Sequence, residues 1–288
     1  MWLTEQKRKI EKRRKIAKAL EVAKQASGVE RHPLPSEVVV SLTSFAPRFA
    51  TLHQVIQSLL FQTMPADRVV LYLKKGEEAQ LPASVSSLVS DKFLIEWRDD
   101  NRSYDKLIHA LIDYPDAYII TVDDDVIYPS NLVKQLVEGR VVNPDAIVCM
   151  RNHRVSFSHD GYLLPYPSWK FNAIDDLARR PSADLMPTGV GGVLYPPHSL
   201  DPRATDIETA KRLAPTADDL WFYWMARLAG TMHVKVGQNT NNLLYTEGSQ
   251  ESGLIHTNWD GANDRQIRAL WLEFGRPNGL DERVRLRD

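Results

Sequence analysis

Apolar positions between residues 37 and 122 follow two different spacings. Short, mostly β-branched runs predict buried strands, whereas apolar residues three and four positions apart predict amphipathic helices. Because the two kinds of unit alternate, we expect an α/β fold whose mainly parallel sheet is flanked by helices. Ligands of such sheets bind beyond the carboxyl ends of the strands. The predicted strands cover 38–42, 69–73, 93–97 and 118–122, and the predicted helices cover 52–60 and 107–111.

Residues 1–35 have a different pattern, in which charged positions dominate. Eight Lys or Arg side chains lie between Lys7 and Lys18, beside a thin apolar stripe, and no Gly or Pro interrupts them. We therefore expect a basic helix followed by a linker, and then one domain over 36–288. Two interpretations of residues 1–30 remain: a solvated helix, or a helix that lies against an anionic membrane surface or a partner.

Composition narrows the classes of function. The chain has 288 residues, of which 43% are hydrophobic, and a formal net charge of −1. This balance is typical of a globular protein and argues against general nucleic-acid binding. The single cysteine, Cys149, excludes an internal disulfide, and its apolar neighbours predict a core position. Since neither a membrane span nor a signal peptide is recognisable, we expect a soluble cytoplasmic protein, with peripheral contact at the inner face of the cell membrane as the alternative.

The strongest chemical signal is Asp123-Asp124-Asp125, directly after the predicted strand 118–122. Three adjacent carboxylates repel one another, and a bound cation relieves this repulsion. Side chains alternate along an extended segment, so we expect Asp123 and Asp125 on one face, as two oxygen ligands of Mn²⁺ or Mg²⁺. The alternative is an ordinary acidic turn before a helix that Ser130 caps.

A second acidic pair, Asp218-Asp219, opens a predicted amphipathic helix whose apolar residues recur at every fourth position. Thr216 is a suitable N-cap for this helix, and Asp219 completes a pattern that resembles a capping box. Acidic residues also stabilise helix N-termini by themselves. A structural role for the pair is therefore open beside a catalytic one.

Several segments together resemble one enzyme family. Residues 119–125 resemble the Asp-X-Asp strand of GT-A glycosyltransferases. Residues 39–45, followed by 59–63, resemble the first strand and helix of family-2-like members, in particular bacterial enzymes of surface-polysaccharide assembly. The similarity spans roughly residues 37–275. It implies a Rossmann-like GT-A fold and an inverting, metal-dependent transfer of a sugar from a nucleotide sugar to a glycan hydroxyl, with the glycan free or lipid-linked.

The resemblance also implies roles for single residues. Asp219 would deprotonate the acceptor hydroxyl, with Asp218 before it where glutamate is commoner, and His256 would be a third metal ligand beside Asp123 and Asp125. The implied donor-binding positions are Thr43, Ser44, Arg48, Asp100, Tyr104, Lys106, Asp124, Gly191 and Gly192. Surface cations explain Arg48 and Lys106 equally well, and a tight turn explains the two glycines.

Two other functions fit parts of this pattern. A sugar nucleotidyltransferase also combines an α/β sheet with paired metal-binding aspartates, but it normally has a Gly-rich, basic phosphate-binding loop after the first strand. The corresponding segment here, 43–48, contains no glycine. A non-catalytic glycan- or nucleotide-binding module would keep the fold without needing Asp219.

Overall fold

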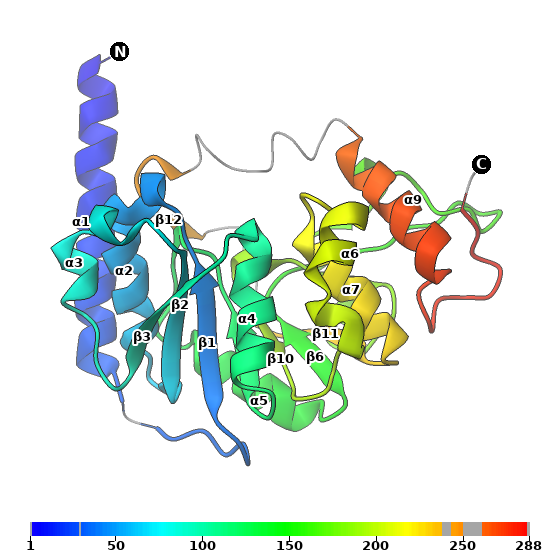
Figure 1. The fold of residues 1–288 in the computed structure, drawn as a ribbon, viewed down its shortest axis with the longest axis horizontal. Helices are drawn as coiled ribbons and strands as arrows, with labels where there is room; N and C mark the ends of the chain where they lie inside the picture. Colours follow the sequence, from blue (N-terminus) through cyan, green and yellow to red (C-terminus); the bar gives the residue numbers. More distant parts are fainter. Residues whose placement is uncertain (1, 29, 238–242, 250–260, 287–288) are drawn as a thin grey trace.

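The computed structural model describes residues 2–28, 30–237, 243–249 and 261–286, and for residues 2–5 the backbone alone. Its centre is a seven-stranded sheet in the order β11-β6-β10-β4-β1-β2-β3 (Figure 1). Neighbouring strands are parallel except at β10, which is antiparallel to both β4 and β6. The strands are β1 (Val38–Thr43), β2 (Arg68–Lys74), β3 (Phe93–Arg98), β4 (Tyr118–Thr121), β6 (Ala146–Cys149), β10 (Val193–Tyr195) and β11 (Met232–Lys235).

Helices cover both faces of this sheet, so alternate residues of the central strand β1 enter two different cores. Val38 and Val40 pack in the core beneath the first group of helices, whereas Val39 packs in the core on the opposite face. The first group is α1 (Trp2–Ala26), α2 (Phe49–Leu60), α3 (Ala83–Ser86) and α5 (Leu132–Val142). The second group is α4 (Asp105–Asp113), α6 (Ile207–Leu213), α7 (Asp218–Leu228) and α9 (Ala262–Phe274) (Figure 1).

Two small sheets lie beside the central one. One has the order β8-β7-β9, and the other pairs β12 with β5. Their strands are β5 (Val126–Ile127), β7 (Asn152–Arg154), β8 (Lys170–Phe171), β9 (Leu185–Pro187) and β12 (Leu244–Tyr245). The α/β class and all four predicted strands are thus confirmed, with ends shifted by one residue at most. Cys149 is fully buried, as predicted.

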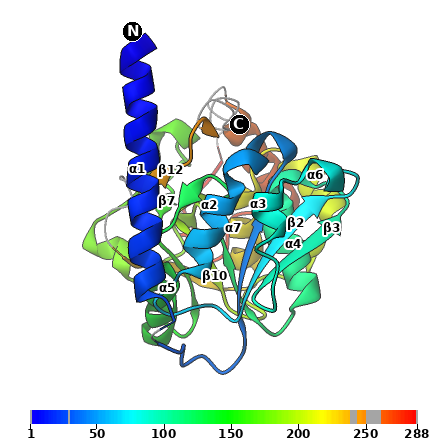
Figure 2. The ribbon, with the colours of Figure 1, turned by 90° about the vertical axis from the view of Figure 1, so that its left-hand side faces the viewer.

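The predicted basic helix is confirmed as α1. Ile16 and Ala23 are buried, and Leu20 packs against the same core, so the C-terminal part of the helix is fixed to the body of the protein. Its N-terminal part extends beyond the rest of the molecule (Figures 1 and 2). Over the described residues, none of the helices, α1 included, combines the length and apolarity needed to cross a bilayer.

Three local expectations from the sequence are wrong. Helix α7 has Ala217 as its N-cap without a side-chain bond, because Thr216 instead accepts a hydrogen bond from Gln266. Helix α5 begins after Asn131, again without a side-chain cap, so Ser130 does not cap it. The acidic segment is also not extended: the chain leaves β4 after Thr121 and turns at 124–125, so strand alternation does not apply there.

Candidate functional site

The predicted site residues gather at one edge of the central sheet. Parallel strands β1 and β4 both end there, so the segments that follow them are neighbours. Strand β10 runs the opposite way, so the segment that precedes it reaches the same edge. The residues brought together are Ser44 and Arg48 after β1, Lys106 in α4, Asp123–Asp125 after β4, Gly189 before β10, and Asp218 and Asp219 in α7.

The acidic turn is held from the β1 side. Asp124 is buried, and its two oxygens accept hydrogen bonds from Ser44 Oγ at 2.6 Å and from Arg48 Nη1. Arg48 Nη1 is also 3.5 Å from Asp125 Oδ2. Arg48 and Ser44 were expected to face the nucleotide; in this structure both bind Asp124.

Burial and charge repulsion disfavour the charged form of Asp125. Loss of hydration raises the pKa of Asp125 to about 6, and repulsion from Asp123 adds to this effect against the attraction of Arg48. Burial likewise raises the pKa of Asp124, in spite of its bonds to Arg48 and Ser44. A further cation near Asp123 and Asp125 would favour their charged forms.

Lys106 connects the two acidic pairs. Its side chain is buried, with Nζ 3.0 Å from Asp123 Oδ1 and 3.2 Å from Asp218 Oδ2. Burial alone would lower the pKa of Lys106, but Asp123, Asp218 and Asp219 outweigh it and hold that pKa well above its usual range. Lys106 is therefore a permanent cation inside the site, and the interpretation as a solvated surface lysine is wrong.

Asp219 is bonded to the glycine segment before β10. Its Oδ1 accepts a hydrogen bond from the Gly189 backbone N–H at 3.2 Å, so the carboxylate points across the site and not along its own helix. Burial and then repulsion from Asp218 raise the pKa of Asp219 to about 7, against the attraction of Lys106. A carboxylate with such a pKa accepts a proton readily near neutral pH.

The glycine segment before β10 is packed against these charges. A Cβ on Gly189 would lie 2.7 Å from Lys106 Nζ and 3.2 Å from Asp123 Oδ1. Gly192 has a φ of +97°, which a side chain disfavours. A Cβ on Gly191 would lie 2.9 Å from Arg151 Cβ. Gly189 and Gly191 are therefore packed closely against other parts of the protein.

Acidic side chains outnumber basic ones at the site, and this balance of charge favours a further cation. Arg48 and Lys106 are two positive charges that contact Asp123–Asp125 and Asp218, with Asp219 beside them. Across the described residues, no three His, Cys, Asp or Glu side chains are grouped to hold a metal. Asp123 and Asp125 still fit a hard divalent ion that takes few protein ligands and keeps water or phosphate oxygens. The predicted third ligand, His256, lies outside the described residues.

Other predicted residues have structural partners. Thr43 Oγ1 donates to the Tyr72 carbonyl at 2.9 Å, and Asp100 Oδ1 accepts from the Arg102 backbone N–H at 2.8 Å. Tyr104 is 1% exposed and donates to the Ala214 carbonyl, which corrects its expected contact with the nucleotide.

Two site residues were missed by the sequence analysis. The Tyr128 hydroxyl accepts from the Asp123 backbone N–H at 2.9 Å and donates to the Val190 carbonyl at 3.2 Å, which ties the acidic turn to the glycine segment. Arg151, directly beyond β6, donates to Thr188 Oγ1 at 2.9 Å. The position of Arg151 directly after the apolar stretch 146–150 was a usable signal, whereas nothing local distinguishes Tyr128.

Neither a protein-family model nor a curated protein matches the sequence. Three solved structures are similar to it at low identity. A 4-diphosphocytidyl-2C-methyl-D-erythritol synthase from Anaerococcus prevotii has a TM-score of 0.46 at 10% identity, covering 77% of this chain and 95% of that one. A CMP:2-keto-3-deoxy-manno-octonic acid synthetase complexed with CTP has 0.43 at 14%, covering 77% and 99%. A proposed nucleotide-diphospho-sugar transferase from Desulfovibrio desulfuricans has 0.42 at 14%, covering 82% and 98%.

Proposed function

We propose that this chain is a nucleotide-sugar-dependent transferase, and within that class an inverting glycosyltransferase that modifies a glycan hydroxyl. The observation that carries the proposal is the position of Asp219. Its carboxylate is bonded to the Gly189 N–H and, through Asp218 and Lys106, lies beside the acidic turn. A base and a cation-binding pair on one site are what a direct displacement at an anomeric carbon requires.

The proposed reaction is one in-line step. The acceptor oxygen forms a bond to the anomeric carbon while the bond from that carbon to the diphosphate oxygen breaks, which inverts the centre. Asp219 takes the acceptor proton. Lys106 keeps Asp218 and Asp123 compensated and thereby limits the rise in the pKa of Asp219. Mn²⁺ or Mg²⁺ bound by Asp123 and Asp125 would neutralise charge on the leaving nucleotide diphosphate.

The rival activity is a sugar nucleotidyltransferase, which attacks a nucleoside triphosphate and releases pyrophosphate. Two of the similar solved structures are named as synthases or synthetases of this kind. This chemistry needs free cations for the triphosphate in the loop after β1. In this chain Arg48, the cation of that loop, is bound to Asp124 and Asp125. We therefore favour the glycosyltransferase, for which a bacterial surface glycan is the acceptor class that the family resemblance suggests.

The first test is a panel of nucleotide sugars, each incubated with and without Mn²⁺. We expect one donor to be hydrolysed slowly in the presence of metal and to raise the melting temperature. Asp125→Asn should abolish metal-dependent hydrolysis, because it removes a charged ligand, while Asp113→Asn on α4, away from the acidic turn, serves as the matched control. Pyrophosphate release from a nucleoside triphosphate and a sugar would instead identify the nucleotidyltransferase. Stabilisation by nucleotides without turnover would identify a binding module.

Gly189→Ala tests the packing of the glycine segment. The added Cβ would meet Lys106 Nζ and Asp123 Oδ1, so the lysine has to move away from the acidic turn. We expect turnover to fall by about tenfold, equivalent to about 1.4 kcal/mol, with a small decrease in melting temperature. Gly230→Ala, at a glycine with positive φ whose Cβ would meet nothing within 4 Å, measures the cost of backbone strain alone, which Gly189→Ala does not incur because the φ of Gly189 is not positive. Unchanged turnover in Gly189→Ala would contradict the role assigned to this contact.

A further inference from the structure

Helix α1 concentrates positive charge. Its sequence from Trp2 to Ala26 holds nine Lys or Arg and three Glu, a net charge of +6, while the whole chain has −1, so the remaining residues sum to −7. Five of its cations are exposed and form no ion pair with any described residue: Lys7, Arg8, Arg14, Lys18 and Lys24. Ile10 and Val22, on the same helix, are 48% and 55% exposed.

Contacts of Lys12 and Arg13 fix the position of α1 along its own axis relative to the candidate site. Lys12 Nζ donates to the Thr246 carbonyl at 2.9 Å, and the Thr246 backbone N–H donates to the Asp125 carbonyl at 2.8 Å. Arg13 also forms an ion pair with Glu247 at 2.6 Å. Lys12 is therefore level with the acidic turn. At about 1.5 Å per residue, Lys7 lies about 7.5 Å further along the helix axis. It lies in the direction of the N-terminal part of α1, which extends past the rest of the molecule (Figures 1 and 2).

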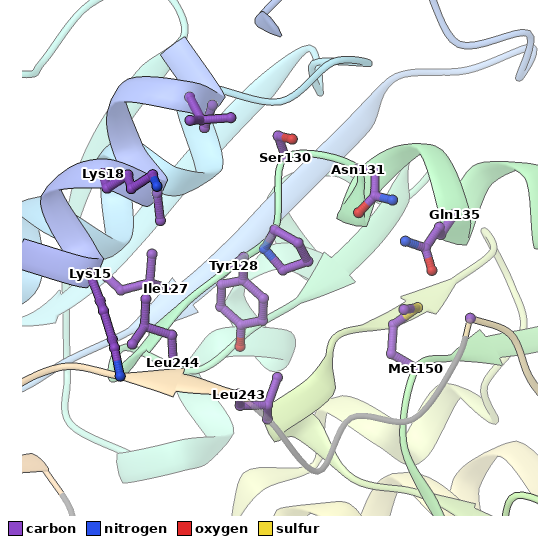
Figure 3. A pocket seen from close by; sticks show the side chains of 15 residues that line it. Lys15, Lys18, Ile127, Tyr128, Ser130, Asn131, Gln135, Met150, Leu243 and Leu244 are labelled. Carbon is purple, nitrogen blue, oxygen red and sulfur yellow. The ribbon is translucent and has the colours of Figure 1, made fainter. Parts of the chain in front are cut away.

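Where α1 meets the body of the protein, cationic and apolar surfaces adjoin. A cavity of about 950 Å³ lies between α1 and residues 127–131. Ile127 and Leu244 contribute apolar walls, and Lys15 and Lys18 reach over the cavity from α1 (Figure 3). Adjoining cations and apolar groups match the boundary between the headgroups and acyl chains of a lipid layer.

We propose that α1 docks this protein on an anionic phospholipid bilayer, with Lys7, Arg8 and Arg14 against the headgroups. Charge complementarity identifies the occupant, since the exposed cations of α1 contrast with the acidic remainder of the chain. Each Lys or Arg near such a surface contributes a separate electrostatic attraction. Docking in this way directs the edge that carries Asp125 towards the bilayer. The inference is independent of the proposed function, because it uses no catalytic role of any residue.

The test is sedimentation of the full chain with vesicles of phosphatidylcholine alone or of phosphatidylcholine mixed with phosphatidylglycerol. The α1 variant replaces three exposed cations with Gln, and a control variant makes the same change in charge on other exposed cations. The α1 set is Lys7, Arg8 and Arg14, and the control set is Lys92, Arg179 and Arg180. We expect wild type and control to bind the mixed vesicles alike, and the α1 variant to bind about 100-fold more weakly.

Binding of wild type should also decrease in high salt, because the exposed charges are screened, and this measurement does not depend on a variant that folds. Equal binding by the α1 variant and the control would overturn the proposal. Equal binding of wild type to neutral and anionic vesicles would overturn it as well. Retention of wild type by a random-sequence oligonucleotide, but not by mixed vesicles, would replace the bilayer with nucleic acid. Nucleotide-sugar hydrolysis without vesicles, measured in parallel, tests the proposed function separately.

Discussion

Asp219→Asn is expected to lower kcat by about 1000-fold, within the range that loss of a general base causes. Asn has the same shape and still accepts a hydrogen bond from the Gly189 N–H through its amide oxygen, but it cannot take the acceptor proton. Binding of the nucleotide, measured by thermal stabilisation, should stay close to wild type. A large loss of turnover with retained binding separates catalysis from folding.

The pH profile gives a second readout of the same residue. Because burial and Asp218 raise the pKa of Asp219 to about 7, the basic form becomes populated only as the pH rises through that value. We expect kcat/KM of wild type to fall about tenfold per pH unit below it. Asp219→Asn should lack this limb. Asp218→Asn removes the charge that helps to raise the pKa of Asp219, so it should keep this limb but move it to lower pH. A larger loss of turnover there than in Asp219→Asn would assign the base to Asp218.

Arg48→Met is expected to destabilise the protein by about 3 to 5 kcal/mol, the cost of leaving a buried carboxylate without its partner. Asp124 is 5% exposed, and Arg48 supplies the positive charge that compensates it. The measurement is the free energy of unfolding in urea. Asp124→Asn should cost less than Arg48→Met, because the neutral amide no longer needs a counter-ion and can still bond to Ser44.

The double variant Arg48→Met/Asp124→Asn decides the origin of this effect. If the uncompensated charge of Asp124 causes the loss, the double variant should be more stable than Arg48→Met alone, with a coupling energy of at least about 1 kcal/mol. Additive losses would show that Arg48 acts through packing, for example its contact with the Phe45 ring at 5.4 Å. Added Mn²⁺ should not restore Arg48→Met, because Asp124 is enclosed by the protein.

The parts of the fold that follow from spacing were predictable from the sequence. Strands such as Val38–Thr43 are buried on both faces and therefore appear as continuous apolar runs. Short elements such as β5 and β10 were not predictable, because two or three residues show no period. The predicted cap of α7 was wrong for a similar reason. The local pattern assigns the Thr216 hydroxyl to the start of this helix, but Gln266, which is distant in the sequence, binds that hydroxyl instead.

The residues of the candidate site were likewise predictable only in part. The acidic turn and the Asp218–Asp219 pair were recognisable, because carboxylates next to predicted elements are visible in a sequence. Their partners were not, since they depend on which segments the sheet order brings together. Arg48 and Lys106 were both read as contacts of a phosphate, whereas they bind Asp124, Asp123 and Asp218. Charge compensation between distant segments is a property of the folded chain alone.

The reversed direction of β10 has a consequence for how such a protein can diverge. Strand β6 ends at the site edge and β10 begins there, so residues 150–192 leave the sheet and return to it at the same edge. That excursion carries the β8-β7-β9 sheet and ends in the glycine segment. Its length and composition can change without shifting the register of any central strand. The early part of this module can therefore vary, whereas its last residues have to be kept, because the Gly189 N–H there is bonded to Asp219.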